Sequence, residues 1–173
     1  MTFMMQSDRD GSIQTDSSHH QNYLTFRIGK EYFGIPLEQT REILEYNGVT
    51  EVPLMPRFLS GVINLRGEMV PVIDLAVRLG RNAIQIQRRT CIIVVEIHSD
   101  GQDHVLGLLA DGVCEVVEIP KPQIEKAPSF GANIRSEFIQ GIAKRDSQFV
   151  VLLDVCNVLS VNELANLVEA ELQ

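Results

Sequence analysis

The strongest constraint on the fold of this 173-residue chain is an internal repeat. The segment FLSGVINLRGEMVPVIDL at 58–75 aligns without gaps on FIQGIAKRDSQFVVLLDV at 138–155, which lies 80 residues further along the chain. A weaker match pairs FGIPLEQTREIL at 33–44 with LGLLADGVCEVV at 106–117, at an offset of 73 residues. Two related structural units explain this pattern better than one continuous sandwich.

Short apolar or alternating runs separated by turn residues occur in both halves of the chain. YLTFRI and EYFGIPL flank Gly29-Lys30, and GVINL and EMVPVI flank Arg66-Gly67. In the second half, CIIVVEI and HVLGLL flank a polar turn, as do QGIAK and FVVLL. Such runs are typical of β-hairpins. The sequence therefore predicts a mostly β fold.

Helical patterns are few. The candidates are LEQTREILEY, DLAVRLG, DVCNVL and the C-terminal tract, in which Ser160 and Glu163 form a capping box ahead of apolar residues at helical spacing. We therefore expect short helices and one C-terminal amphipathic helix. Residues 81–89, RNAIQIQRR, are polar and basic and predict a loop between the halves.

The first 22 residues predict a flexible tail, because residues 6–22 contain a single Ile among polar and charged groups. The folded domain is then expected over residues 23–173. Its three cysteines are odd in number and lie in apolar runs, which indicates buried thiols in a reducing compartment. Since no window reaches the roughly 18 apolar residues of a membrane span and no secretory signal is evident, we expect a cytoplasmic protein without membrane insertion.

Charge and motifs exclude several functions. The 15 Lys and Arg against 23 Asp and Glu give a net charge of -8, which disfavours nucleic acid as a partner. The four His residues lack partners at zinc-ligand spacing, and the sequence carries no phosphate-binding loop or nucleophile elbow. No metal or cofactor is therefore expected.

Asp74 and Asp154 occupy equivalent positions in the repeat and are the one pair that suggests catalysis. An aspartic protease has one Asp from each of two related β units, but there Thr or Ser and then Gly follow the Asp. Here Leu75-Ala76 and Val155-Cys156 follow instead. The sequence favours an N-cap of a short helix at each Asp, with a duplicated β-barrel hydrolase as the alternative.

Several runs together resemble the CheW family of chemotaxis coupling proteins. They are YFGIPLEQTREIL, the stretch from Pro53 to Leu75 that contains NLRG-x-x-VPVIDL, LGLLADGV-x-EVVEIP and FIQGIAKRDSQFVVLLDV. The resemblance covers roughly residues 22–170. It implies two intertwined five-stranded β-barrels of the SH3-like type and no enzymatic activity.

The resemblance also implies the function and partners. Members of this family couple the cytoplasmic tip of a chemoreceptor to the regulatory domain of a CheA-type histidine kinase, within membrane-associated arrays. Related couplers serve twitching or developmental arrays, so the pathway stays open. An SH3-like domain for proline-rich peptides is disfavoured because the chain has no Trp and 6% aromatic residues.

The resemblance assigns receptor binding to Thr40, Glu42, Arg66 and Val113. It places Thr40 and Glu42 at the rim of a groove between the units, and Val113 in the matching turn of the second half. From the residues alone, Arg66 is equally well a solvated turn residue. The segment around Thr40 is a helical or extended surface with Ile43 and Leu44 pointing inward.

The resemblance places the kinase-binding site near Phe58 and Leu59, at the start of the repeated unit. From the residues alone, both are core side chains, each contributing about 1.5–3 kcal/mol by burial.

Overall fold

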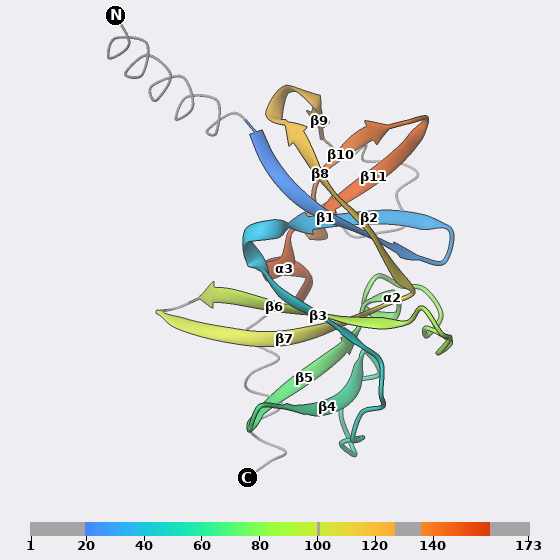
Figure 1. The fold of residues 1–173 in the computed structure, drawn as a ribbon, viewed down its shortest axis with the longest axis vertical. Helices are drawn as coiled ribbons and strands as arrows, with labels where there is room; N and C mark the ends of the chain where they lie inside the picture. Colours follow the sequence, from blue (N-terminus) through green and yellow to red (C-terminus); the bar gives the residue numbers. More distant parts are fainter. Residues whose placement is uncertain (1–19, 100, 127–135, 160–173) are drawn as a thin grey trace, which may run out of the picture.

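The computed structural model describes residues 20–99, 101–126 and 136–159. Its elements, drawn in Figure 1, are β1 (His20–Ile28), β2 (Glu31–Pro36), η1 (Leu37–Gln39), β3 (Thr40–Glu45), β4 (Leu59–Leu65), β5 (Glu68–Asp74), α2 (Leu75–Arg78), β6 (Cys91–Ser99), β7 (Gln102–Ala110), β8 (Gly112–Pro120), η2 (Lys121–Gln123), β9 (Ile124–Glu125), η3 (Ser136–Phe138), β10 (Ile139–Arg145), β11 (Gln148–Leu153) and α3 (Val155–Leu159). The mostly β prediction is confirmed.

The strands form two sheets. One has six strands in the order β8-β1-β2-β11-β10-β9, and the other has five in the order β3-β6-β7-β5-β4. In Figure 1 the six-stranded sheet is the upper layer and the five-stranded sheet the lower one. The largest buried apolar cluster contains residues of both sheets, such as Phe26 and Phe33 of the first and Ile93 and Leu108 of the second. The main core therefore joins the sheets.

The two halves of the chain exchange hairpins. The β1–β2 hairpin of the first half pairs in parallel with β11 of the second half. Reciprocally, the β6–β7 hairpin of the second half pairs in parallel with β5 of the first. Each sheet therefore contains strands from both halves, and the predicted intertwining is confirmed.

The register of this exchange follows the sequence repeat. Gly34 lies opposite Leu152 at one junction, and Gly107 lies opposite Val72 at the other. A Cβ on Gly34 would stand 2.9 Å from the Leu152 Cδ2 atom, and one on Gly107 would stand 2.7 Å from Ile92 Cγ2. Real Cβ atoms do not approach this closely, so an alanine at either junction would force the neighbouring side chain to shift.

The repeated segments are also alike in detail. The register shifts between Leu59 and Gly61 in one half, and between Ile139 and Gly141 in the other. The Asp74 backbone N–H donates to the Phe58 carbonyl at 2.6 Å, and the Asp154 N–H donates to the Phe138 carbonyl at 2.9 Å. The gapless alignment therefore corresponds to equivalent backbone conformations.

One difference between the sheets concerns their edges. Ile124 and Glu125 form a two-residue strand against β10. The corresponding contact in the other sheet is a single bridge between Thr50 and Val62. This difference makes the first sheet six-stranded, where the family resemblance implied five strands in each.

Arg78 lies where the two halves meet. Its guanidinium carbon is 4.8 Å from the ring centroid of Phe58 and 5.0 Å from that of Phe138. Its Nε–H donates to the Val158 carbonyl at 2.6 Å. Phe58 and Phe138 are equivalent in the repeat, so one cation connects the same position of both units.

Two of the four helical predictions are confirmed and one is wrong. DLAVRLG contains α2 and DVCNVL contains α3. LEQTREILEY forms a short 3-10 turn followed by β3, because this segment pairs with β6. Ile43 consequently points outward, with 45% of its side chain exposed, and its predicted inward position is wrong. The predicted C-terminal helix lies outside the described residues.

The predicted boundaries agree partly with the structure. β1 begins at His20 and pairs with β8 from that residue, so the strand includes the last three residues assigned to the tail. The rest of that tail, 1–19, lies outside the described residues. Residues 81–89 form the loop expected between the halves.

Candidate partner-binding surfaces

The β4–β5 turn presents Arg66 in an unusual backbone conformation. Arg66 and Gly67 have φ values of 52° and 87°, the positive pair that a two-residue hairpin turn of type I′ requires. The Gly67 backbone N–H donates to the Asn64 side-chain carbonyl at 2.8 Å. A non-glycine residue at positive φ is disfavoured, so the hairpin holds Arg66 at a fixed position on the surface.

Arg66 is paired with Glu42 of β3. The Arg66 Nη2 group donates to both Glu42 carboxylate oxygens, at 2.7 and 2.5 Å. The Arg66 side chain is 65% exposed and that of Glu42 is 27% exposed. Because the pair is largely solvated, we expect it to add only about 0–1 kcal/mol to stability. Both bonds use one nitrogen, so the remaining guanidinium donors can meet an external acceptor.

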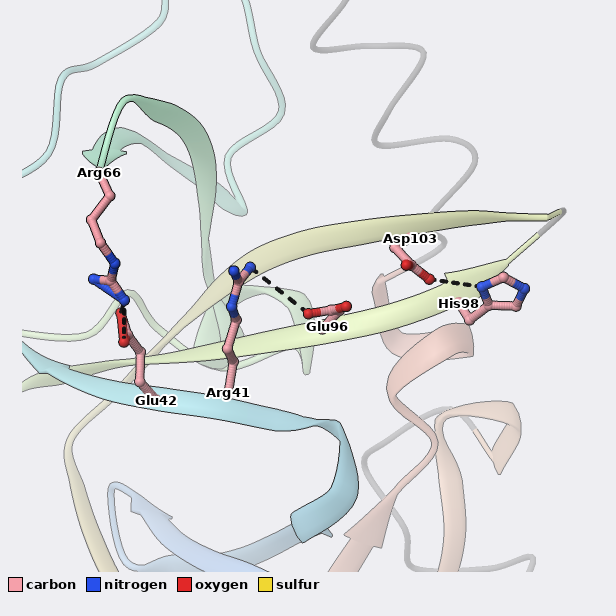
Figure 2. A network of polar contacts seen from close by, with 6 residues as sticks. All are labelled: Arg41, Glu42, Arg66, Glu96, His98 and Asp103. Carbon is pink, nitrogen blue, oxygen red and sulfur yellow. Dashed lines mark hydrogen bonds and ion pairs between the residues drawn. The ribbon is translucent and has the colours of Figure 1, made fainter.

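An ion pair and a histidine–carboxylate contact continue this surface along the five-stranded sheet. Arg41 lies 3.8 Å from Glu96, and the His98 Nδ1 atom lies 2.7 Å from the Asp103 carboxylate. Figure 2 shows Arg66 reaching from the β4–β5 turn toward Glu42, and Arg41 reaching from β3 toward Glu96 of β6. The outer surface therefore carries a polar network that extends toward the β6–β7 tip.

Two exposed apolar side chains lie close in sequence to the Arg66–Glu42 pair. Ile43 follows Glu42 on β3 and is 45% exposed, and Met69 of β5 is 53% exposed. The sequence analysis did not predict that either side chain is exposed. The alternating pattern of TREILE, in which Ile43 lies two residues from Arg41 and from Glu45, could have identified Ile43.

Thr40 and Val113 lie in different sheets. Thr40 begins β3, where its hydroxyl donates to the Pro36 carbonyl at 3.4 Å. Val113 belongs to β8, pairs with Phe26 and packs half-buried against the main core. Of the four residues assigned to receptor binding, the structure brings Glu42 and Arg66 into contact.

Phe58 and Leu59 contribute to the fold. Both are partly buried against the main core, Leu59 pairs with Ile73, and Phe58 contacts the Arg78 guanidinium. The preceding loop has a feature that sequence reasoning missed. Leu54 is 92% exposed and has a φ of 63°. A large apolar side chain that is exposed and in a strained backbone conformation is a candidate contact residue.

Asp74 and Asp154 cap helices, as the sequence favoured. The Asp74 carboxylate accepts from the Val77 N–H at 3.3 Å and from the Ile84 N–H at 3.0 Å. The Asp154 carboxylate accepts from the Asn157 N–H at 3.2 Å. Each carboxylate thus accepts a hydrogen bond from a backbone N–H in the first turn of its helix.

Comparison with known proteins gives the family. A family model described as CheW-like domain matches residues 22–163. The chain belongs to this family. The chemotaxis protein CheW of Klebsiella aerogenes is 34% identical over 145 residues, which are 84% of this chain and 85% of that protein. Protein FrzA of Myxococcus xanthus is 30% identical over 152 residues, covering 87% of this chain and 92% of that protein.

A solved structure agrees with this assignment. The scaffolding protein TtCheW from Thermoanaerobacter tengcongensis superimposes with a TM-score of 0.72 at 33% identity, covering 82% of this chain and 94% of that chain. The CheW-like fold and the family inferred from the sequence are therefore confirmed.

Two further observations concern the described part of this CheW-like chain. None of its helices is long and apolar enough to cross a membrane. Within the same residues, no three His, Cys, Asp or Glu side chains are grouped so that they could hold a metal ion.

Proposed function

We propose that this CheW-like protein is a cytoplasmic, non-enzymatic adaptor that couples a chemoreceptor to a CheA-type histidine kinase. Membership of the family supports the proposal, together with the relatives named as chemotaxis proteins. As a scaffold in a membrane-associated array, the adaptor raises the concentration of the kinase near the receptor and biases its conformation. No chemical step of its own is needed.

The receptor-binding surface is proposed to centre on Arg66 and Glu42, with Thr40 and Val113 contributing. A receptor tip is a helical hairpin, and an amphipathic helix needs apolar contacts flanked by polar ones. Ile43 follows Glu42 on β3, so its exposed side chain lies on the other face of that edge strand and supplies an apolar contact there. The Arg66 guanidinium donors not used by Glu42 supply polar contacts to carboxylates or carbonyl groups on the helix.

The kinase-binding surface is proposed to lie near Phe58 and Leu59. Because both side chains are partly buried, the loop before them is the better direct contact. Leu54, which is 92% exposed, is the apolar side chain in that loop that a partner domain can cover.

The hydrolase alternative has little structural support. The Asp74 side chain accepts two backbone hydrogen bonds and the residue is 5% exposed. A second candidate role is the same adaptor function in another receptor array, which the similarity to FrzA favours. Titrating the protein with the kinase of each array, and comparing the two affinities, distinguishes the chemotaxis pathway from the other one.

The proposal is tested by an amide NMR titration of the labelled protein with a receptor-tip hairpin and, separately, with the regulatory domain of a CheA-type kinase. We expect two separate groups of shifted resonances, one around Arg66 and one around Leu54. Arg66→Glu should weaken receptor binding by about tenfold, roughly 1.4 kcal/mol, and leave kinase binding unchanged. Leu54→Ser should weaken kinase binding by about tenfold and leave receptor binding unchanged.

Matched controls exist for both variants. Lys144→Glu reverses the charge of an exposed cation on β10, away from the proposed contacts, and Ile86→Ser removes another exposed apolar side chain, which is 50% exposed. Neither control should alter binding beyond about twofold. Failure of both partners to shift any resonance at concentrations that cover about micromolar binding would reject the adaptor function for these partners.

A further inference from the structure

A basic hollow, whose lining includes none of the residues proposed above to bind a partner, lies between the β1–β2 turn, the loop that joins the two halves, and the start of β8. It has a volume of about 510 Å³. Its lining includes Arg27, Lys30, Glu31, Arg81, Gln87 and Asp111. In Figure 1 the β1–β2 turn and α2 lie on the same side of the molecule.

Arg27 carries an unused donor at this hollow. Its Nε atom is buried and has no hydrogen-bond partner. Burying a polar group without a partner costs about 1–3 kcal/mol, and more for a charged group. Native structures contain few such groups, and each requires an explanation. Arg27 also lines the hollow, where its guanidinium can meet an acceptor on a ligand.

The surrounding charges favour an anionic ligand. Lys30, Arg88 and Arg89 are exposed and form no ion pair within the described part of the chain. Arg88 and Arg89 follow directly after Gln87, and the Arg89 Cβ lies 3.8 Å from where a Cβ on Gly112 would stand. Lys30 itself lines the hollow, and the two arginines adjoin its lining residue Gln87 in the sequence.

The two carboxylates of the hollow already have partners. Glu31 accepts two hydrogen bonds from Arg81, both of 2.8 Å. Asp111 accepts one from the Gly29 backbone N–H at 2.5 Å. The lining has three cations, Arg27, Lys30 and Arg81, against these two carboxylates, and Arg88 and Arg89 adjoin it, so a local positive excess remains on a protein whose net charge is -8. Such an excess attracts negatively charged partners.

We propose that the basic hollow binds an acidic segment of a partner polypeptide. One carboxylate of the segment would pair with the Arg27 guanidinium, and others would pair with Lys30 and Arg89. The spread of the cations along a turn and a loop suits several carboxylates in series better than one compact anion. The surface adds a third contact to the adaptor, distinct from those proposed for the receptor and the kinase.

The test uses the full chain and a fluorescent peptide of alternating Glu and Gly, with a Gln-Gly peptide of the same length as the neutral probe. Fluorescence anisotropy gives both affinities. We expect the acidic peptide to bind at least about tenfold more tightly, and to weaken as salt rises from about 50 to 200 mM. Arg89→Gln should weaken binding about threefold or more.

Arg27→Met separates binding from folding. The substitution keeps the apolar stem and removes the unsatisfied donor, so the free energy of unfolding in urea should not fall. Binding of the acidic peptide should fall about fivefold or more. Lys144→Gln, which removes an exposed cation from β10, is the control and should leave binding unchanged.

Three results would overturn the proposal. Equal affinity for the acidic and neutral peptides would remove the role of charge. Unchanged peptide binding in both Arg27→Met and Arg89→Gln would place any binding elsewhere. Displacement of the peptide by inorganic phosphate that itself binds more tightly would identify a small-anion site. None of these results decides the receptor and kinase titrations, which are read from the resonances around Arg66 and Leu54.

Discussion

Arg78 should stabilise the fold by linking the two halves, and Arg78→Met tests this directly. Methionine retains the apolar stem of arginine but loses the cation and the Nε–H donor. The cation lies 4.8 Å from the Phe58 ring centroid and 5.0 Å from the Phe138 one. Each cation–π contact contributes about 0.5–1 kcal/mol when exposed and about 2 when desolvated. The hydrogen bond to the Val158 carbonyl has a charged donor and contributes about 1.5–3 kcal/mol.

Because these contributions are not additive, we expect Arg78→Met to lower the free energy of unfolding by about 3 kcal/mol. Urea unfolding followed by circular dichroism measures this change. Arg78→Lys keeps the charge but loses the planar group, so it should cost about half as much. Double-mutant cycles with Phe58→Leu and Phe138→Leu should each give a coupling energy of about 0.5–1.5 kcal/mol. A loss below about 0.5 kcal/mol, with both couplings near zero, would refute a linking role.

Four other substitutions test the fold. Asp74→Ala should lower the free energy of unfolding by about 1–3 kcal/mol in urea, because it removes a helix cap and leaves the Ile84 N–H without its acceptor. Asp154→Ala should lower it by about 1 kcal/mol, because only a cap is lost. Equal losses for the two variants would contradict the extra role of Asp74. Gly107→Ala should cost about 1–3 kcal/mol in the same assay, because its Cβ would stand 2.7 Å from an Ile92 methyl carbon; an unchanged midpoint would show that the junction is loose. Burial raises the pKa of the Cys91 thiol from 9.0 to about 11. The unfolded chain loses this proton first, so the free energy of unfolding should fall as pH rises from 9 to about 11, and Cys91→Ala should flatten that slope in urea titrations at several pH values.

The sequence pattern predicted the hairpins and the repeat because both depend on local signals. Positive φ at Arg66 and Gly67, and period-two alternation around them, are encoded within a few residues. The helix caps at Asp74 and Asp154 are equally local. The gapless alignment of the repeats also fixed which residues are equivalent, including Phe58 and Phe138.

Other features depended on contacts between distant segments. Thr40 and the residues after it carry a helical pattern, but pairing with β6 outweighs that propensity. Cys114 was expected to be buried and is exposed, because it lies on β8 at the edge of a sheet. The contact between Arg66 and Glu42, 24 residues apart, depends on how the sheet brings β3 and the β4–β5 turn together. The contacts of Arg78 with Phe58 and Phe138 could not be predicted, because they depend on how the two halves are placed relative to each other.

The exchange of hairpins also determines the order in which the chain can fold as it is synthesised. The five-stranded sheet uses only residues between Thr40 and Ala110, so all its strands are available before β8 has been made. The six-stranded sheet begins with β1 and β2, but β2 has no partner on its outer side until β11 emerges more than a hundred residues later. Such distant pairing is slow to form, and an open strand edge favours association with other chains. During translation, the β1–β2 hairpin is therefore made first but gains its last neighbouring strand late. The unpaired outer edge of β2 is the site at which nascent chains are most exposed to misassembly.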